Sequence, residues 1–267
     1  MQSASKYVDA EFSNITITAF IDMAGLAGSS LSLNEKKSQL QSLVNDCFKH
    51  GENINCEVVA TANISEYCRT YCDDNNIELV VKTGHRSESI FYTPLDWQLL
   101  RHLPCPLLIA NPIEVSHRKV LLATVDAFNK GKEHVELDKK VLIWAAQMAK
   151  LRRFELHVTS CIEASDAFND SDEKILENLV SLHEKEVQQY VDNLMTDINL
   201  DYAGLTIVAG KPENLIPRVA VEQDVALVAI GSVARSGLQG FLLGNTGEKV
   251  MHNLKTDLAI IPATANL

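Results

Sequence analysis

The 267-residue sequence lacks the short motifs that mark several classes of enzyme. It has no GxSxG nucleophile elbow, no HExxH zinc motif and no GxxxxGKS or GxxxxGKT phosphate loop. Its eight histidines are not paired at the spacing of metal ligands. We therefore expect no catalytic residues and no metal site, and we expect the protein not to be an enzyme.

Long apolar runs and closely spaced cysteines are also lacking. No stretch approaches the roughly 18 apolar residues of a membrane span. Residues 1–6 are not a charged segment leading into an apolar one, as in a secretory signal. The six cysteines include no CxxC pair, which is typical of reduced, mostly buried thiols in a cytosolic protein. These features predict a cytoplasmic protein that does not contact a membrane.

Positive charge is in the minority throughout. The net charge is −11, of which the residues up to Pro112 carry −5 and the remainder −6. Because both halves are acidic, direct binding of nucleic acid or of an anionic membrane is disfavoured. The 46% apolar and 22% charged content is ordinary for a globular protein with a substantial core.

What the sequence does contain is a regular alternation of strands and helices after His117. The apolar run over 119–126 has the composition of a strand buried on both faces, and 135–151 has the apolar period of a helix. Five strands alternating with four helices predict an α/β fold with a doubly wound parallel sheet. The other expected strands are 155–162, 205–210, 225–230 and 257–261, and the other helices are 172–195, 212–223 and 246–254.

The first half repeats this order incompletely, which predicts an internal duplication. We expect domains over 1–113 and 118–263, the first lacking its initial strand. Its expected strands are 15–21, 56–61, 77–82 and 107–110, and its helices are 34–50, 64–73 and 94–103. The lost strand leaves its neighbours either to pair directly or to face a gap. Whether the true start lies upstream of Met1 stays open.

A loop rich in glycine, serine and threonine follows the strand that ends at Ile230. It runs from Gly231 and Ser232 to Gly244, Asn245 and Thr246, where a helix is expected to begin. Backbone N–H groups and the helix dipole make such a junction a candidate anion site. The alternatives are structural: the glycines can serve turn geometry, and Asn245 can simply cap its helix.

The spacing of Gly231, Ala234, Gly244 and Asn245-Thr246 resembles the signature of the universal stress protein family. Ala234 replaces the second glycine of that signature, and Asn245 replaces its hydroxyl residue. Three further segments resemble the tandem, UspE-type branch of the family: Phe241–Val250, Phe91–Arg101 and Pro104–Pro106. The resemblance implies two tandem domains, each with strand order 3-2-1-4-5.

The resemblance also implies a ligand site in the second half. In family members that bind ATP, an acidic residue and the corner after strand 2 hold adenine and ribose, and the loop holds the phosphates. The positions that match or border this site are Asp126, Cys161, Gly210, Gly231, Ser232, Gly244, Asn245 and Thr246. Asp126 has a structural alternative as the cap of the helix that follows it. ATP or another small ligand is thus a candidate for the second half.

The first half is the poorer candidate for a ligand. Its loop over 83–93 is shorter and holds one glycine, Gly84, and the lost strand would have carried the acidic residue. We therefore expect any bound nucleotide to lie beside Gly231, Gly244 and Thr246.

The leading functional hypothesis, given the resemblance, is a cytoplasmic bacterial protein of the response to stasis or DNA damage. It would bind partners or a small ligand without turnover. The alternatives are an ATP-binding switch and a weak ATPase. The strands over 107–110 and 258–261 are strongly apolar, so we expect the two halves to pair antiparallel through them. A homodimer and other protein partners stay open.

Overall fold

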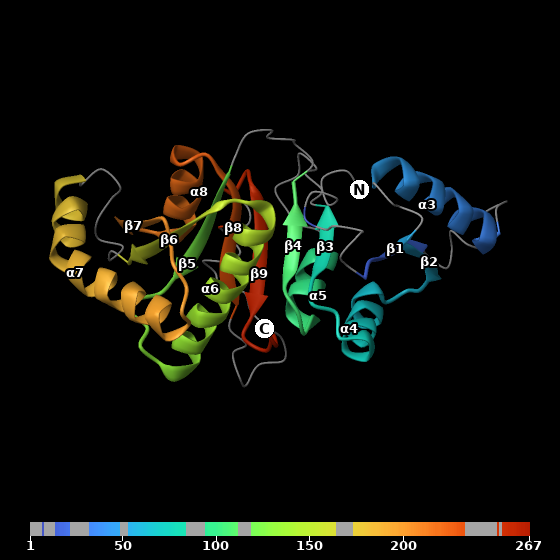
Figure 1. Ribbon diagram of the computed structural model, residues 1–267, viewed down its shortest axis with the longest axis horizontal. Coiled ribbons are helices and arrows are strands. Elements are labelled where there is room, and N and C mark those ends of the chain that lie inside the picture. Colours follow the sequence, from blue (N-terminus) through green and yellow to red (C-terminus); the bar gives the residue numbers. More distant parts are fainter. Residues whose placement is uncertain are drawn as a thin grey trace.

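The computed structural model describes residues 7, 14–21, 32–48, 53–83, 94–111, 119–163, 173–232, 250 and 253–267. In the first half the elements are β1 (Thr16–Ile21), α3 (Leu33–Cys47), β2 (Asn55–Ala60), α4 (Ile64–Asn75), β3 (Val80–Thr83), α5 (Pro94–His102) and β4 (Leu107–Ala110). In the second half they are β5 (Val120–Val125), α6 (Lys132–Arg152), β6 (Glu155–Ile162), α7 (Glu173–Asp197), β7 (Gly204–Ala209), α8 (Pro212–Glu222), β8 (Val225–Ser232) and β9 (Asp257–Pro262). Figure 1 shows the two halves side by side along the long axis.

The second half has the predicted doubly wound parallel sheet. Its strands lie in the order β9-β8-β5-β6-β7, which is the order 3-2-1-4-5 read from the other edge. β5 is central and pairs in parallel with β6 on one side and with β8 on the other. The predicted α/β fold class and strand order are therefore confirmed in this half.

The two halves share one sheet. β4 pairs antiparallel with β9, with Leu107 opposite Ile260 and Ile109 opposite Leu258. This contact extends the sheet to the order β3-β4-β9-β8-β5-β6-β7 (Figure 1). Both apolar strands, expected to be hazardous as free edges, thus lie in the interior of a continuous sheet.

The first half is divided instead. β1 and β2 pair in parallel in a separate two-stranded sheet, and no pairing between β1 and β3 is present among the described residues. Of the two outcomes left open for a half without its first strand, the structure shows the separated one. A small core of its own lies under β1, β2 and α3, with members Leu40, Val44, Phe48, Ile54 and Cys56.

Two larger cores lie on opposite faces of the shared sheet, and each draws on both halves. One core packs under α6 and α7 and includes Leu108 of the first half beside Val141 of the second. The other packs under α5 and α8 and includes Leu99 of the first half beside Val219 of the second. The boundary expected near residues 113–118 therefore divides the sequence but does not divide the hydrophobic core.

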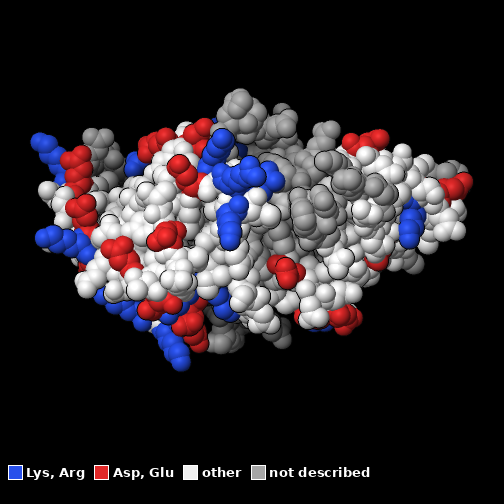
Figure 2. Space-filling model, viewed as in Figure 1, with Lys and Arg blue, Asp and Glu red and all other residues white. Residues whose placement is uncertain are grey.

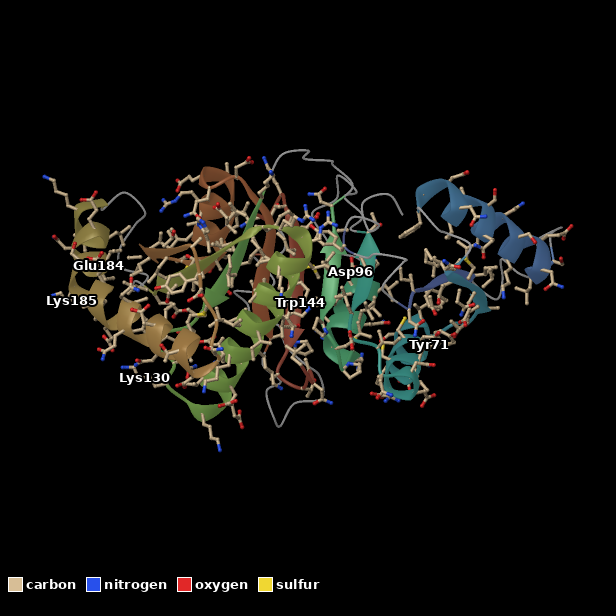
Figure 3. All side chains as sticks on the ribbon, viewed as in Figure 1. Tyr71, Asp96, Lys130, Trp144, Glu184 and Lys185 are labelled. Carbon is tan, nitrogen blue, oxygen red and sulfur yellow. The ribbon has the colours of Figure 1, made fainter. Side chains whose placement is uncertain are left out.

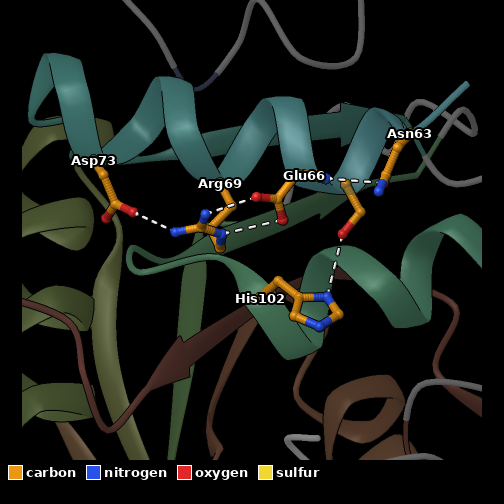
Figure 4. Close-up of polar contacts among 6 residues, drawn as sticks. Asn63, Glu66, Arg69, Asp73 and His102 are labelled. Atoms are coloured by element: carbon orange, nitrogen blue, oxygen red, sulfur yellow. Dashed lines mark hydrogen bonds and ion pairs between the residues drawn. The ribbon is translucent and has the colours of Figure 1, made fainter. Parts of the chain in front are cut away.

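Local chemistry explains where the helices begin. α3 starts with a capping box, in which Ser32 N donates to Glu35 Oε2 (2.7 Å) and Glu35 N donates to Ser32 Oγ (3.3 Å). α4 starts at Asn63, whose Oδ1 accepts from Glu66 N (3.1 Å; Figure 4). α8 has the proline expected in its first turn.

Ion pairs run along the exposed side of α4, and one hydrogen bond from the buried Ser65 joins this helix to α5. Arg69 pairs with Glu66 (2.7 Å) and with Asp73 (3.0 Å) along the helix (Figure 4). Ser65 Oγ lies 3.2 Å from His102 Nδ1 at the end of α5. This hydrogen bond links α4 to the helix that covers β4.

Several predicted boundaries differ from the structure by one to three residues, and two of the differences have a clear cause. β3 begins at Val80 and not at Ile77, because the residues opposite 77–79 include Pro104 and Pro106, which have no N–H for the ladder. β8 extends past Ile230 to Ser232, since β9 continues beside it as far as Pro262. Gly231 and Ser232 therefore belong to the strand and not to the loop. Most of the expected helix over 246–254 lies outside the described residues.

Candidate ligand-binding site

Four of the candidate residues lie where neighbouring strands of the second half end. Asp126 follows β5, Cys161 is near the end of β6, Gly210 follows β7 and Ser232 ends β8. The register places Val125 opposite Ser160, so Asp126 and Cys161 stand at the same level. The carboxyl ends of parallel strands at a switch in strand order are the usual ligand site of such sheets.

The alternation of side chains sorts these residues by face. Cys161 packs against the core under α8, and Ser232 has the same parity as Val228 and Ile230 of that core. Gly210 likewise has the parity of Val208, which packs there too. The structure therefore brings Cys161, Gly210 and Ser232 together on the face of the sheet that α8 covers.

Asp126 begins a turn and holds it with its side chain. Its Oδ1 accepts from the backbone N–H groups of Phe128 and Asn129, both at 3.3 Å. α6 begins only after Gly131, which occupies its N-cap without a side-chain hydrogen bond. The alternative that Asp126 caps this helix is therefore wrong, because the intervening turn holds the carboxylate away from the first helical N–H groups. Its Oδ2 has no hydrogen-bond partner among the described residues and is available to a ligand.

Cys161 is held as a neutral thiol. Burial raises the pKa of this thiol to about 12, and the negative charges of Asp126 and Glu163 act in the same direction. Arg218 of α8 lowers that pKa, so its guanidinium lies within electrostatic range of the site. A neutral thiol is a poor nucleophile, so what Cys161 offers at this edge of the sheet is shape and backbone groups.

The two described glycines of the site have different reasons for being glycine. Gly210 has φ of 133°, a backbone conformation that side chains disfavour, and its N–H donates to Ile162 O (2.9 Å). A Cβ on Gly231 would lie 2.7 Å from Leu137 Cγ of α6. Gly231 is thus required because α6 approaches closely on the opposite face of the sheet. This explanation replaces the turn geometry considered for Gly231 from the sequence.

Ser232 carries a buried hydroxyl with an unused hydrogen-bonding capacity. The residue is 3% exposed, and its Oγ has no hydrogen-bond partner in the part of the chain that the structure describes. Only its backbone is paired, through Ser232 O accepting from Ala263 N (3.0 Å). An unpaired buried hydroxyl costs about 1–3 kcal/mol, and such groups often mark the place of a ligand or an ordered water. The site therefore fits a ligand that carries its own polar atoms.

A second buried serine provides a contrast. Ser160 is fully buried, and its Oγ also has no hydrogen-bond partner within the described ranges. Its parity is that of Leu156 and Val158, which belong to the core under α6 and α7. Ser160 therefore faces away from Ser232 and Cys161, although it also lies near the carboxyl end of its strand, β6.

The remaining candidates lie outside the described residues. These are Gly244, Asn245 and Thr246, together with Ala234 of the signature and Gly84 of the first half. The part of the site that the resemblance assigns to phosphates is therefore not described. Of the residues that surround the described part, Arg218 and Asp138 were missed from the sequence. Asp138 gave a signal, since it is an acidic residue between the buried positions Leu137 and Val141.

Charged groups elsewhere in the described residues were compared with the needs of a metal site. Within the described ranges, no three His, Cys, Asp or Glu side chains are arranged to hold a metal ion. Acidic and basic groups are interspersed over the face shown in Figure 2. None of the helices described is both long enough and apolar enough to span a bilayer.

Comparisons with known proteins match this chain to universal stress proteins. Residues 132–262 match the profile of the universal stress protein family. The universal stress protein E homolog of Haemophilus influenzae is 27% identical over 266 residues, covering 91% of this chain and 85% of that protein. Universal stress protein E of Photorhabdus laumondii is 30% identical over 204 residues, covering 70% of this chain and 62% of that protein.

The fold comparison covers both halves. A universal stress protein from Archaeoglobus fulgidus matches with a TM-score of 0.64 at 15% identity, covering 98% of this chain and 93% of that chain. At this identity the likeness concerns the fold alone. The region shared with the Photorhabdus protein is less than two thirds of that protein's length.

Proposed function

Because this chain belongs to the universal stress protein family through its C-terminal domain, we propose that it is a cytoplasmic stress-response protein of the tandem E type. In this proposal the second half binds a small ligand at the ends of β5, β6, β7 and β8 and does not turn it over. The observation that carries the proposal is the buried, unpaired hydroxyl of Ser232 on the same face as Cys161 and Gly210.

The chemistry of the site supports a hydroxylated, anionic ligand of the adenine-nucleotide class. Asp126 Oδ2 can accept from a ribose hydroxyl, and Ser232 Oγ can donate to or accept from the ligand. Arg218 adds a positive charge on α8, within electrostatic range of Cys161. The resemblance to the family assigns the adenine and ribose positions to Asp126 and to the corner at Cys161.

The described residues also support binding without turnover. Asp126 is committed to its turn through Oδ1, and the Cys161 thiol is neutral. Among the described residues, Ser232 has no base placed to remove its proton, since its Oγ has no hydrogen-bond partner there. The described part of the site therefore offers shape and hydrogen bonds, without a nucleophile paired to a base.

Calorimetric titration with ATP, followed by a hydrolysis assay, tests the proposal. We expect saturable binding and no release of phosphate above the uncatalysed rate. Ser232→Ala should weaken binding about 2- to 12-fold, the equivalent of one hydrogen bond of about 0.5–1.5 kcal/mol. The matched control is Ser160→Ala, which removes an equally buried serine from the opposite face and should leave the affinity unchanged.

The second candidate is an ATP-driven switch or weak ATPase. It is favoured by the sequence of the segment after Ser232, whose glycine-rich approach to an expected helix start at Thr246 is a candidate anion site. Steady hydrolysis that Ser232→Ala reduces in parallel with binding would establish it. Absence of binding by ATP and by other adenine nucleotides would overturn both candidates.

A further inference from the structure

A buried acidic side chain stands behind the candidate site without taking part in it. Asp138 is on α6, and it is 6% exposed. Its Oδ2 accepts two hydrogen bonds, from Tyr190 OH of α7 (2.7 Å) and from the backbone N–H of Asp126 (3.1 Å). One carboxylate oxygen thus joins α6 and α7 to the residue that follows the central strand.

The turn that begins at Asp126 is fastened to α7 at three places. The Asp138 carboxylate links Asp126 to Tyr190 in the interior. At the surface, Phe128 packs edge-on against His183 (5.2 Å between ring centroids), and Lys130 Nζ lies 2.7 Å from Glu186 Oε1 (Figure 3 shows Lys130). The surface contacts are exposed to solvent and weak, so the buried link dominates.

The charged form of the Asp138 carboxylate is energetically unfavourable in this buried position. Burial raises its pKa to about 7, which outweighs the lowering by its hydrogen bonds to Tyr190 and Asp126 N. The negative charge of Asp126 raises it further. A costly ionisable group retained beside a ligand site is a common sign of a functional constraint.

Few other ionisable groups face Asp138 from the elements packed around α6. β8 has none, and Asp257 of β9 is engaged by Tyr7 and Asn111 N. Cys161 of β6 packs on the opposite face of the sheet. Among the described residues, Asp138 therefore depends on Tyr190 and Asp126 alone.

We propose that Asp138 is a positioning residue for the ligand site: its charged carboxylate holds the Asp126 turn in the binding geometry, and neutralisation of that charge releases it. The inference rests on the proposed function, since it assigns a regulation to the same site. A carboxylate accepts both hydrogen bonds strongly, whereas a neutral acid accepts them more weakly. The site would therefore respond to pH near neutrality.

The test uses adenosine as the probe, because an uncharged ligand separates the geometry of the turn from attraction to phosphates. Its affinity is measured by calorimetry at pH 8 and pH 6, and the backbone amide of Asp126 is followed by NMR between those values. In the unmodified protein we expect the amide to titrate near pH 7 and the affinity to fall several-fold on acidification.

Three variants make the test specific. Asp138→Asn keeps the shape of the neutral acid, and it should bind at both pH values as the unmodified protein does at pH 6. Tyr190→Phe removes a hydrogen bond that favours the charged form, so it should move the midpoint of the amide titration to higher pH. Asp197→Asn removes an exposed acid that pairs with Lys139 (3.0 Å), and it should change neither readout.

The outcomes separate this inference from the proposed function. An Asp126 amide that ignores both pH and Asp138→Asn overturns the positioning role. An amide that titrates while adenosine binds equally well at both pH values overturns it as well, because the turn then does not control the ligand. If neither adenosine nor ATP binds at any pH, the proposed function fails, and the inference fails with it as a device of the ligand site.

Discussion

The two halves differ most at their centres. In the second half, β5 lies between β6 and β8 and buries Leu121, Leu122 and Ala123 completely. In the first half, β1 and β3 occupy the corresponding flanking places, and no described strand joins them. The result is one continuous sheet on one side and a separate two-stranded sheet on the other (Figure 1).

The difference shows that a central strand has two tasks. It connects the two outer parts of a doubly wound sheet, and it carries an acidic residue to the carboxyl edge where ligands bind. Without it, β3 and β4 continue the sheet of the second half through β9. β1, β2 and α3 depend on their own small core. Their stability should therefore be local and low.

The largest expected effect comes from shortening a side chain in each centre. Leu122→Ala removes a fully buried side chain from β5 and should lower the free energy of unfolding by about 3–5 kcal/mol. Ile17→Ala, in the half-buried β1, should lower it by about 1 kcal/mol, because less apolar surface is lost there. Urea unfolding of both variants measures the two losses in free energy of unfolding. Equal losses would contradict the separation of the two regions.

The pH dependence of stability is the next largest effect, and it belongs to the second half. The pKa of Asp138 is raised in the folded protein to about 7, so its stabilising effect is complete below about pH 4 and is lost as pH rises through 7. Relative to Asp138→Asn, the unmodified protein should lose up to about 4 kcal/mol across that range. Thermal unfolding of both proteins at several pH values measures this difference. A constant difference would show that Asp138 titrates at an ordinary pKa.

The signature loop offers a third comparison, although its positions lie outside the described residues. If Ala234 and Asn245 weaken phosphate binding, then Ala234→Gly combined with Asn245→Ser should raise the affinity for ATP. Glycine removes a Cβ and serine restores a compact hydroxyl, worth on the order of 1–3 kcal/mol or about 5- to 150-fold in Kd. Titration calorimetry compares the double variant with the parent. Equal affinities would make both departures neutral.

The smallest effect concerns the contact of the N-terminal segment with the second half. Tyr7 is buried in the core under α6, its OH donates to Asp257, and the Arg152 guanidinium lies 5.9 Å from its ring. Tyr7→Phe should lower the free energy of unfolding by about 1–2 kcal/mol, because Asp257 keeps the hydrogen bond from Asn111 N. The control Tyr202→Phe removes the hydroxyl that donates to Asp192 and accepts from Gln188 nearer the surface, and it should cost less. An equal cost for the two would remove Tyr7 as a link between the halves.

Much of the fold could be predicted from the sequence because each element has its own local signal. The run over 119–126 and the helical period over 135–151 predicted β5 and α6, which the structure places at nearly the same bounds. Asp126, Cys161, Gly210 and Ser232 could be selected because they follow or end buried strands. Their shared edge then follows from the topology of a parallel sheet.

The features that could not be predicted from the sequence depend on contacts between distant segments. Gly231 was interpreted as a loop glycine, yet its lack of a side chain serves Leu137 of α6, which is far away in sequence. Asp138 was not selected from the sequence, because only the fold brings Tyr190 and Asp126 N to its carboxylate. In both cases the deciding contact joins residues that no local pattern relates.

The sequence by itself determined the composition of the layers: which segments are strands, which are helices, and that the chain repeats its own plan. Period and composition carry that information because they act over a few neighbouring residues. Only the tertiary structure decided that β1 and β3 stay apart, that both large cores cross the boundary between the halves, and that Asp138 supports the site. Those outcomes depend on contacts between distant segments, whose energies become defined only when the sheet has been assembled.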